Sequence, residues 1–255
     1  VPVILLSNAY VDILEEIDGY EEFSDKTRVL HARKKVETKK VEKKENDITS
    51  APFIVYISGS DTRSQKLDVS RSDVNIIATV NPITKEVLLI STPRDYFVPT
   101  TVSGGQPDKL THCGIYGIDC SIGTLEMLYG VNITHYAQIN FTGFETLIDA
   151  IGGITVYSEK ETYTREGHFH LYKGNNEMSG EVALAFVRDR FTYPDGDWAR
   201  SRHQMAVIKA VIKKASSGST IVNNYADILS SLEGMFTTDF TSDEFSALAK
   251  MQISD

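Results

Sequence analysis

Three short apolar runs between residues 53 and 90 constrain the fold most. They are Phe53–Ile57, Val74–Val80 and Val87–Ile90. Each has the length of a buried strand and is bounded by residues that favour turns. Pro52 precedes the first run, and Asn81-Pro82 followed by Thr84 separates the last two, which predicts a tight turn there. The sequence therefore predicts a sheet that begins near residue 53.

Helical patterns follow this strand-rich region. Glycines end two predicted helices, Asp119–Tyr129 at Gly130 and Phe141–Ile151 at Gly152-Gly153, and a strand follows at Ile154–Tyr157. A third helix is predicted at Ser179–Phe186 with Ser179 as N-cap, and a fourth at Arg200–Ala215. The last helix is predicted after the capping box Thr241-x-x-Glu244. Helices interspersed with strands are expected to cover both faces of a sheet. The predicted fold class is α/β, an α-β-α sandwich with a central mixed sheet.

The first 50 residues have a different character. Apolar side chains from Val3 to Ile17 recur at near-helical spacing, and Lys34–Glu45 is rich in lysine and glutamate with few apolar residues. The second stretch is typical of a solvated linker or an exposed hairpin. We therefore place a boundary near Ser50. Residues 1–50 are expected to be part of a small N-terminal accessory domain or a linker, and residues 51–255 the main domain.

The overall charge excludes one class of partner. The formal net charge is −9, whereas proteins that bind duplex nucleic acid normally show a basic field. No apolar run approaches the roughly 20 residues that a membrane-spanning helix needs. Because the chain begins with Val1 rather than Met, we expect an ectodomain attached to the membrane through a segment absent from this chain.

The arginines after residue 48 are concentrated, while the lysines are scattered. Seven of the eight arginines lie in Asp61–Asp73, Pro93–Asp95 and Arg188–Arg202, namely Arg63, Arg71, Arg94, Arg188, Arg190, Arg200 and Arg202. Guanidinium groups bind phosphate oxygens bidentately, which an ammonium cannot do. The segments adjoin ends of predicted elements, where sites on α/β sheets are usually built. Surface ion pairs explain any single Arg–Asp pair, but the clustering favours a phosphate site.

Acidic and polar residues accompany these arginines. Asp61 and Asp73 are suited to a hard cation such as Mg²⁺, which binds through one or two carboxylates and substrate phosphate oxygens. One of them could instead accept the proton of an attacking hydroxyl, and Asp61 could simply cap a turn. Arg200 and Gln204 are four residues apart, on one helix face. Asp197 could cap that helix or bind a ligand group.

Two cysteines, Cys113 and Cys120, match no common zinc or redox spacing. Two interpretations stay open. They are buried thiols, or they form a disulfide that an oxidising exterior would permit. His112 and His135 are isolated, so a structural role is expected for both.

Several motifs together resemble the LytR–CpsA–Psr family. They are Ile57-Ser-Gly-Ser-Asp61, Ser70-Arg-Ser-Asp-Val74, Thr92-Pro-Arg-Asp95, Asp108-Lys-Leu-Thr-His112, Ile151-Gly-Gly153, Phe186-Val-Arg-Asp-Arg190, and Asp197 through Arg200 to Gln204. Their order and gaps match from about Phe53 to Ala215. The nearest likeness is to streptococcal capsule-associated members, whose extra N-terminal domain residues 1–50 would partly represent.

The resemblance implies a reaction and a site. A phosphoglycan, here capsular polysaccharide, would pass from a polyprenyl pyrophosphate carrier to peptidoglycan, on the extracytoplasmic face of the bacterial membrane. Pyrophosphate would be held by Arg71, Arg94, Arg188, Arg190, Arg200 and Gln204; Asp61 and Asp73 would bind Mg²⁺, or Mn²⁺ in its place; Arg71, Asp73 and Arg94 would be catalytic. The lipid tail would lie in an apolar tunnel between sheet and helices.

Some assignments within the resemblance are weaker. Many relatives have Asn or Gln where this chain has His203, which leaves its ligand contact open, and Arg63 and Arg202 match less firmly. A non-catalytic polyprenyl-phosphate-binding regulator of capsule synthesis is the main alternative function. A transcriptional role is disfavoured by the acidic balance.

Overall fold

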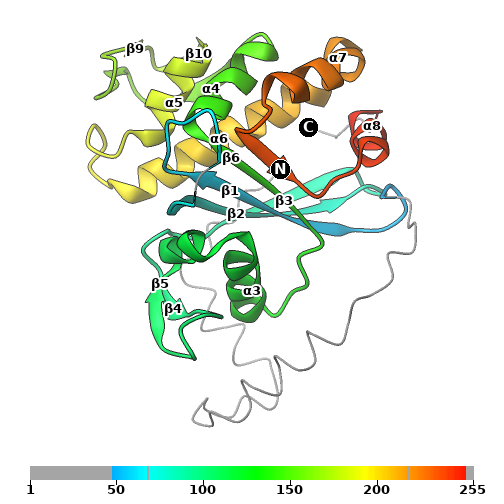
Figure 1. Ribbon diagram of the computed structural model, residues 1–255. Helices are drawn as coiled ribbons and strands as arrows, with labels where there is room; N and C mark the ends of the chain where they lie inside the picture. Colours follow the sequence, from blue (N-terminus) through cyan, green and yellow to red (C-terminus); the bar gives the residue numbers. More distant parts are fainter. Residues whose placement is uncertain (1–47, 68, 217–218, 251–255) are drawn as a thin grey trace.

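The computed structural model describes residues 48–67, 69–216 and 219–250, and these form three layers (Figure 1). The middle layer is a sheet of strand order β11-β6-β1-β2-β3. β1 (Phe53–Ser60) runs parallel to β6 (His135–Asn140) and antiparallel to β2 (Ser72–Asn81). The outer strands β3 (Glu86–Ser91) and β11 (Phe236–Thr238) pair antiparallel with β2 and β6. The predicted mixed sheet and α-β-α sandwich are confirmed.

One face of the sheet carries a short layer, and the other carries most helices (Figure 1). The first layer contains β4 (Phe97–Pro99), β5 (Pro107–Lys109), the 3-10 helix η1 (Leu110–Tyr116) and α3 (Ile118–Tyr129). The second contains α4 (Phe141–Ala150), α5 (Gly180–Arg188), α6 (Asp197–Ser216), α7 (Ser219–Ser231) and α8 (Ser242–Lys250). Two hairpins join α4 to α5: β7 (Ile154–Ser158) with β10 (Gly174–Met178), and β8 (Thr162–Tyr163) with β9 (His170–Leu171).

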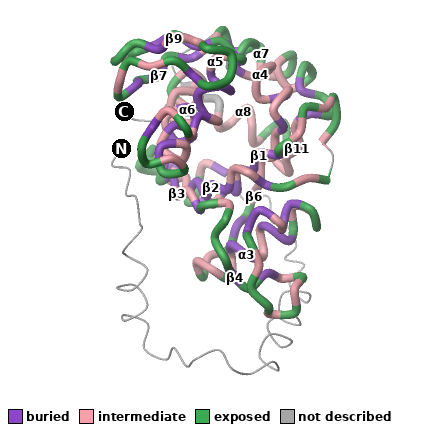
Figure 2. Tube along the Cα trace, turned by 90° about the vertical axis from the view of Figure 1, so that its left-hand side faces the viewer, coloured by how far each residue is buried: buried purple, intermediate pink, exposed green. Residues whose placement is uncertain are grey.

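Alternation along the central strands explains why they appear continuously apolar in sequence. Val55 and Ile76 pack in one core cluster with Met205 of α6. Their neighbours Tyr56 and Ile77 pack in the cluster on the other face. Successive side chains of a strand point to opposite faces, and both faces are covered here, so both are apolar. Figure 2 shows this burial along the strands and the inner faces of the helices.

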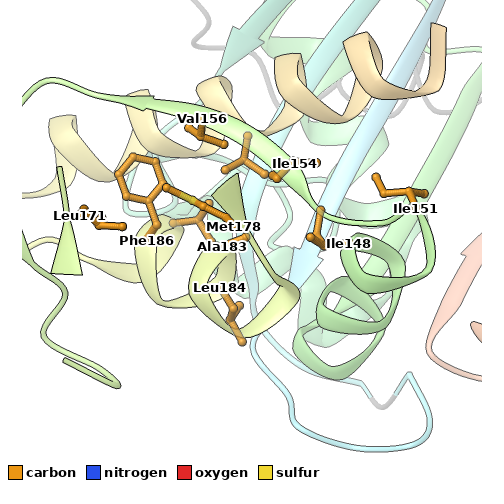
Figure 3. Packing of buried hydrophobic residues seen from close by; sticks show 11 residues of the cluster. Ile148, Ile151, Ile154, Val156, Leu171, Met178, Ala183, Leu184 and Phe186 are labelled. Atoms are coloured by element: carbon orange, nitrogen blue, oxygen red, sulfur yellow. The ribbon is translucent and has the colours of Figure 1, made fainter. Parts of the chain in front are cut away.

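A third core cluster holds the helical layer and its hairpins together. Side chains from α4, β7, β9, β10 and α5 turn toward one another in Figure 3, including Ile148, Ile154, Leu171, Met178 and Phe186. All five are at most 2% exposed. This packing fixes α5, and with it the segment that leads into α6.

Most predicted helix ends are confirmed. Gly130 ends α3 with a left-handed φ of 64°, and Thr241 and Glu244 form the expected capping box before α8. Ser179 occupies the N-cap of α5, but its side chain makes no capping hydrogen bond. The Asp149 side chain accepts the N–H of Gly180 instead, at 2.7 Å.

Two parts of the sequence interpretation need comment. The strands β6 and β11 were not predicted, although β6 pairs directly with β1. The expected accessory segment lies largely outside the described residues, so the division at residue 50 stays a prediction. No helix within the described ranges has the length and apolar character to cross a membrane.

Candidate functional site

The topology brings separate segments to one end of the sheet. β1 and β6 are parallel, and β2 is antiparallel to both β1 and β3. The carboxyl ends of β1, β3 and β6 and the start of β2 therefore share an edge. Asp61 follows β1, Arg71 precedes β2, Asp73 lies at its start, and Arg94 follows β3. This shared edge is the structural reason why distant sequence motifs meet.

Asp73 and Arg94 form the central ion pair of the site. Nη1 of Arg94 donates to both carboxylate oxygens of Asp73, at 2.8 Å each. Burial lowers the pKa of Arg94, but the hydrogen bond and charge of Asp73 outweigh this and raise it above its usual value. Nε of Arg94 is buried without a hydrogen-bond partner, although Asp95 Oδ2 lies 3.4 Å away. The Arg94 guanidinium therefore lies between two carboxylates.

Asp61 lies beside this pair. Asp61 is exposed as a residue, but partial desolvation of its carboxyl raises the pKa, and the negative charge of Asp73 raises it further. Arg188, Arg94 and Arg71 act in the opposite direction without cancelling the shift. A carboxylate whose charge is disfavoured by a neighbouring carboxylate is a place where a proton or a cation is favoured.

Arg200 comes to the same place from the first turns of α6. Its side chain is only 11% exposed and reaches Asp197 at 3.5 Å, while its buried Nε has no hydrogen-bond partner. Burial lowers the pKa of Arg200, Asp197 and Asp73 oppose the shift, and Arg94 and Arg190 add to it. A buried, incompletely paired guanidinium is costly without an anion. Gln204, one turn further along, is 9% exposed.

Arg188 and Arg190 differ in a way the sequence did not predict. Arg188 is the last residue of α5 rather than following it. It pairs with Glu166 and lies over the Phe141 ring, 4.6 Å from its centroid. Arg190 makes no ion pair among the described residues and lies 4.9 Å from the centroid of Phe191. The two arginines of this segment therefore differ in pairing: Arg188 has a carboxylate partner, and Arg190 contacts a ring.

The backbone around Arg71 is held by close packing. Gly114 of η1 lies against it, and a Cβ there would be 2.5 Å from the Ser70 carbonyl oxygen and 2.6 Å from the Ser72 nitrogen. Asn75 donates to the Ser72 carbonyl at 3.1 Å and accepts from the Tyr56 hydroxyl at 2.6 Å. Arg71 itself is exposed and makes no ion pair within the described ranges. The backbone that carries Arg71 is therefore held rigidly, and the Arg71 guanidinium group extends from it without an ion-pair partner among the described residues.

The residues of uncertain role are structural or peripheral. His203 is 4% exposed, stacks on Phe186 with centroids 4.0 Å apart, and contacts the Phe186 carbonyl oxygen through Nδ1 at 3.1 Å. Burial lowers its pKa, which keeps the imidazole neutral. Arg202 pairs with Glu159 and Asp195, and Arg63 pairs with Glu145. His203 is thus a core residue in the ligand-free structure.

Both cysteines are free and buried, which agrees with the thiol interpretation rather than the disulfide. Sγ of Cys113 lies 3.4 Å from the Thr124 hydroxyl. His135 stacks on Phe240 with centroids 4.3 Å apart, which confirms its structural role, and His112 contacts Asp108 at 2.9 Å.

Sequence reasoning missed several neighbours of the arginines. Arg165 lies outside the three segments, yet its guanidinium is 3.9 Å from the centroid of Phe191, the ring that also receives Arg190. Glu166 and Phe141 contact Arg188. No local pattern marks Arg165, Glu166 or Phe141, because each of them contacts a residue more than 20 positions away.

The donor set fits a magnesium ion in one respect. No group of three metal-ligating side chains occurs within the part of the chain that the structure describes. Mg²⁺ needs only one or two carboxylates when phosphate oxygens and water complete its shell. Asp61 and Asp73 offer such a pair, and a cation between them would offset the repulsion that raises the pKa of Asp61.

Arginines and two carboxylates thus gather at one end of the mixed sheet of an α/β domain. The LytR_cpsA_psr family model matches residues 16–254. TagU of Bacillus mycoides, a polyisoprenyl-teichoic acid–peptidoglycan teichoic acid transferase, is 36% identical over 216 residues, 84% of this chain and 67% of TagU. The chain belongs to the LytR_cpsA_psr family and spans about two thirds of the length of its curated relatives.

Solved structures agree with this assignment. A Streptococcus agalactiae protein is 26% identical with a TM-score of 0.72, covering 82% of this chain and 77% of its own. The structure of TagT bound to LI-WTA is 28% identical with a TM-score of 0.68, covering 83% of this chain and 78% of TagT. The family resemblance inferred from the motifs is confirmed.

Proposed function

We propose that this chain transfers a phosphoglycan from a polyprenyl pyrophosphate carrier to a hydroxyl of peptidoglycan. The observation that carries the proposal is the convergence of Arg94, Arg200 and the Asp61–Asp73 pair at one end of the sheet. The name of the relative TagU, a teichoic acid transferase acting between a polyisoprenyl carrier and peptidoglycan, supports the same reaction class. We propose capsular polysaccharide as the glycan, from the likeness to capsule-associated members.

The reaction is a displacement at phosphorus. The acceptor hydroxyl oxygen forms a bond to the phosphorus that carries the glycan, and the bond from this phosphorus to the bridging oxygen of the pyrophosphate breaks. The bridging oxygen leaves as part of polyprenyl phosphate, and the hydroxyl proton passes to a carboxylate of the Asp61–Asp73 pair. The product is a phosphodiester between glycan and acceptor, and polyprenyl phosphate is released.

Phosphoryl transfer requires mainly positioning and charge neutralisation from the protein. In this proposal the pyrophosphate oxygens are bound by Arg71, Arg94, Arg188, Arg190, Arg200 and Gln204. Preorganised cations aimed at developing charge lower the barrier most in a site that excludes water. Asp61 and Asp73 would hold Mg²⁺ or Mn²⁺, which neutralises phosphate charge when bound. Arg71, Asp73 and Arg94 would then be in contact with the reacting groups.

The proposed setting follows from the substrates. A polyprenyl carrier is embedded in a membrane and peptidoglycan lies outside it, so the domain would act on the extracytoplasmic face. The lipid tail would enter an apolar space between the sheet and the helices. In this proposal a segment outside this sequence attaches the domain to the membrane.

The deciding experiment supplies lipid-linked glycan, peptidoglycan and Mg²⁺ to the purified protein and measures release of polyprenyl phosphate by mass spectrometry. We expect release with Mg²⁺ and none with EDTA. Lipid-linked teichoic acid is run in parallel with lipid-linked capsular polysaccharide, and faster turnover of the former would reassign the glycan. Tight binding of polyprenyl phosphate with no release under any condition would favour the non-catalytic regulator. If the protein neither binds polyprenyl phosphate nor releases it from the donor, the proposal is wrong.

A further inference from the structure

The β8–β9 hairpin carries a stack of three aromatic rings. Tyr163 and His170 are cross-strand partners, and their rings stack with centroids 4.5 Å apart and planes 13° from parallel. The ring of Tyr172 contacts that of His170, with centroids 4.3 Å apart and planes tilted by 54°. His170 also contacts Glu161 through Nε2 at 2.9 Å. The His170 ring is therefore held between two tyrosines and by one carboxylate.

The stack is exposed although the hairpin beneath it is anchored. Tyr163 is 58% exposed and Tyr172 is 61% exposed. Leu171, between His170 and Tyr172, is only 2% exposed and belongs to the core of the helical layer. The hairpin thus buries its one aliphatic residue and leaves its large rings in water. Clustered exposed aromatics commonly mark an interaction site.

Hydrogen bonds fix the hairpin from both sides. The Thr164 hydroxyl donates to the Glu166 carbonyl at 2.6 Å and accepts from the Phe169 N–H at 3.0 Å. The Asn176 side chain accepts from the Tyr172 N–H at 2.9 Å and donates to the Tyr172 carbonyl at 2.8 Å. The rings are therefore preorganised, which reduces the ordering cost when a ligand binds.

The same hairpin touches the phosphate site. Glu166, in its turn, pairs with Arg188. The neighbouring Arg165 stacks on Phe191, which also receives Arg190. Figure 1 shows the β9 hairpin beside α5, whose last residue is Arg188. A chain-like ligand that reaches the arginines can therefore continue over the hairpin.

The chemistry of this surface fits a sugar chain. Aromatic faces carry negative charge in their quadrupole, which attracts the C–H-rich face of a pyranose ring, and polar groups at the rim meet its hydroxyls. The segment 159–177 carries Glu159, Glu161, Glu166 and Glu177 against Lys160, Arg165 and Lys173. This near balance does not suit a polyanionic phosphate polymer. It suits a glycan backbone without phosphates.

We propose that the Tyr163–His170–Tyr172 stack binds the glycan strand of the peptidoglycan acceptor and presents it to the arginine site. This inference rests on the proposed transferase function and names the acceptor subsite of the same reaction. The rings act as a positioning surface, so they should affect acceptor binding without affecting binding of the phosphate carrier.

The test is co-sedimentation of the protein with insoluble peptidoglycan stripped of attached polymers, with no donor present. Tyr163→Ala and Tyr172→Ala should each weaken binding by about three- to tenfold, the size of one lost aromatic contact. Tyr163→Trp, which keeps a ring, should retain binding. Tyr116→Ala is the matched control, because Tyr116 is 64% exposed but belongs to η1 in the layer on the opposite face of the sheet. It should sediment like the wild type.

Several outcomes would overturn the inference. These are wild-type sedimentation of the double variant Tyr163→Ala/Tyr172→Ala, tighter binding of the stack to soluble teichoic acid than to stripped peptidoglycan, or ring-dependent binding to phospholipid vesicles in place of glycan. Melting temperature with and without polyprenyl phosphate is measured for each variant. A wild-type protein that sediments with peptidoglycan but shows no shift with polyprenyl phosphate would contradict the proposed transferase and leave the glycan surface standing.

Discussion

A single nitrogen of Arg94 donates to both carboxylate oxygens of Asp73, at 2.8 Å each. An arginine proposed to bind phosphate and a carboxylate proposed to bind a metal ion therefore neutralise each other. Phosphate on one side and a cation on the other would each have to compete with this pair. Binding of the two is thus expected to be cooperative, since each frees the partner that the other needs.

Removing the carboxylate separates the two halves of this arrangement. We expect Asp73→Ala to abolish Mg²⁺-dependent turnover, because one of two proposed ligands is lost. Binding of polyprenyl phosphate without metal should become several-fold tighter, since Arg94 is released and a negative charge leaves the site. Turnover and metal-free binding are measured on the same preparation. Asp95→Ala is the control, because Asp95 also lies near Arg94 and its loss should leave turnover close to wild type.

Two arginines of α6 provide a matched pair. Arg200 is buried with an unpartnered Nε, whereas Arg202 pairs with Glu159 and Asp195. Without ligand, we expect Arg200→Met to melt at the wild-type temperature or about 2–4 °C higher. The reason is that the change removes a buried charge whose burial costs roughly 1 kcal/mol. The same variant should lose the ligand-induced shift. Arg202→Met should melt slightly lower and keep the shift, and the reverse pattern would contradict the assignment.

Arg188 and Arg190 should also behave differently from each other. Each alanine variant is expected to lose about tenfold to a hundredfold in polyprenyl phosphate affinity, the size of one charge-assisted hydrogen bond. Only Arg188→Ala should also lower stability, by about 0–1 kcal/mol, because Arg188 alone has an ion-pair partner, Glu166. Lysine variants should recover part of the affinity, since charge returns without the planar fork.

A second variant checks the Arg188 interpretation. Glu166→Ala should tighten phosphate binding, since it frees Arg188 of a competing carboxylate. Isothermal titration measures the affinity for polyprenyl phosphate, and thermal melts measure the stability of each variant. If Arg190→Ala binds polyprenyl phosphate as tightly as the wild type, Arg190 is not part of the proposed pyrophosphate site.

Sequence patterns predicted the strands and the site membership for local reasons. Val74–Val80 is apolar on both faces because both sides of β2 are covered, whereas Leu88 of the edge strand β3 stays 39% exposed. The turn at Asn81 follows from its side chain accepting two backbone N–H groups. The placement of Arg71 and Arg94 at element ends was visible because strand ends are marked by their flanking residues. These features depend only on near neighbours in the chain.

Other features depend on partners that the sequence does not mark. β6 contains His135 and Gln138 and has no apolar run, so only its pairing with β1 makes it a strand. The Glu166–Arg188 pair joins residues 22 apart. His203 was open between ligand and core, and the rings of Phe186 and Tyr193 around it decide for the core.

The Asp61 carboxyl gives the remaining prediction, a pH dependence. Burial and the charge of Asp73 raise its pKa in the folded protein. A carboxyl whose pKa is raised in the folded state favours folding when it is protonated. Its ionisation therefore lowers stability as the pH rises above the pKa of the unfolded chain, about 3.9 for Asp. Asp61→Asn removes that ionisation. We expect the variant to melt higher than the wild type at pH 7, by a few degrees at most, with the difference shrinking as pH falls toward 4.

The effect of Mg²⁺ on melting shows whether the ionised Asp61 carboxylate, which lowers stability, serves to bind a metal ion. A cation held by Asp61 and Asp73 favours the ionised carboxylates, so saturating Mg²⁺ should raise the wild-type melting temperature at pH 7 and leave Asp61→Asn almost unchanged. The advantage of the variant should then disappear or reverse. Melts at pH 4 to 8 with Mg²⁺ or EDTA measure this, and Asp119→Asn, which removes an exposed carboxylate of α3, serves as the control. An Asp61→Asn advantage that Mg²⁺ leaves intact would show that Asp61 is an ionised carboxylate without a metal ion, and the base role would then fall to it.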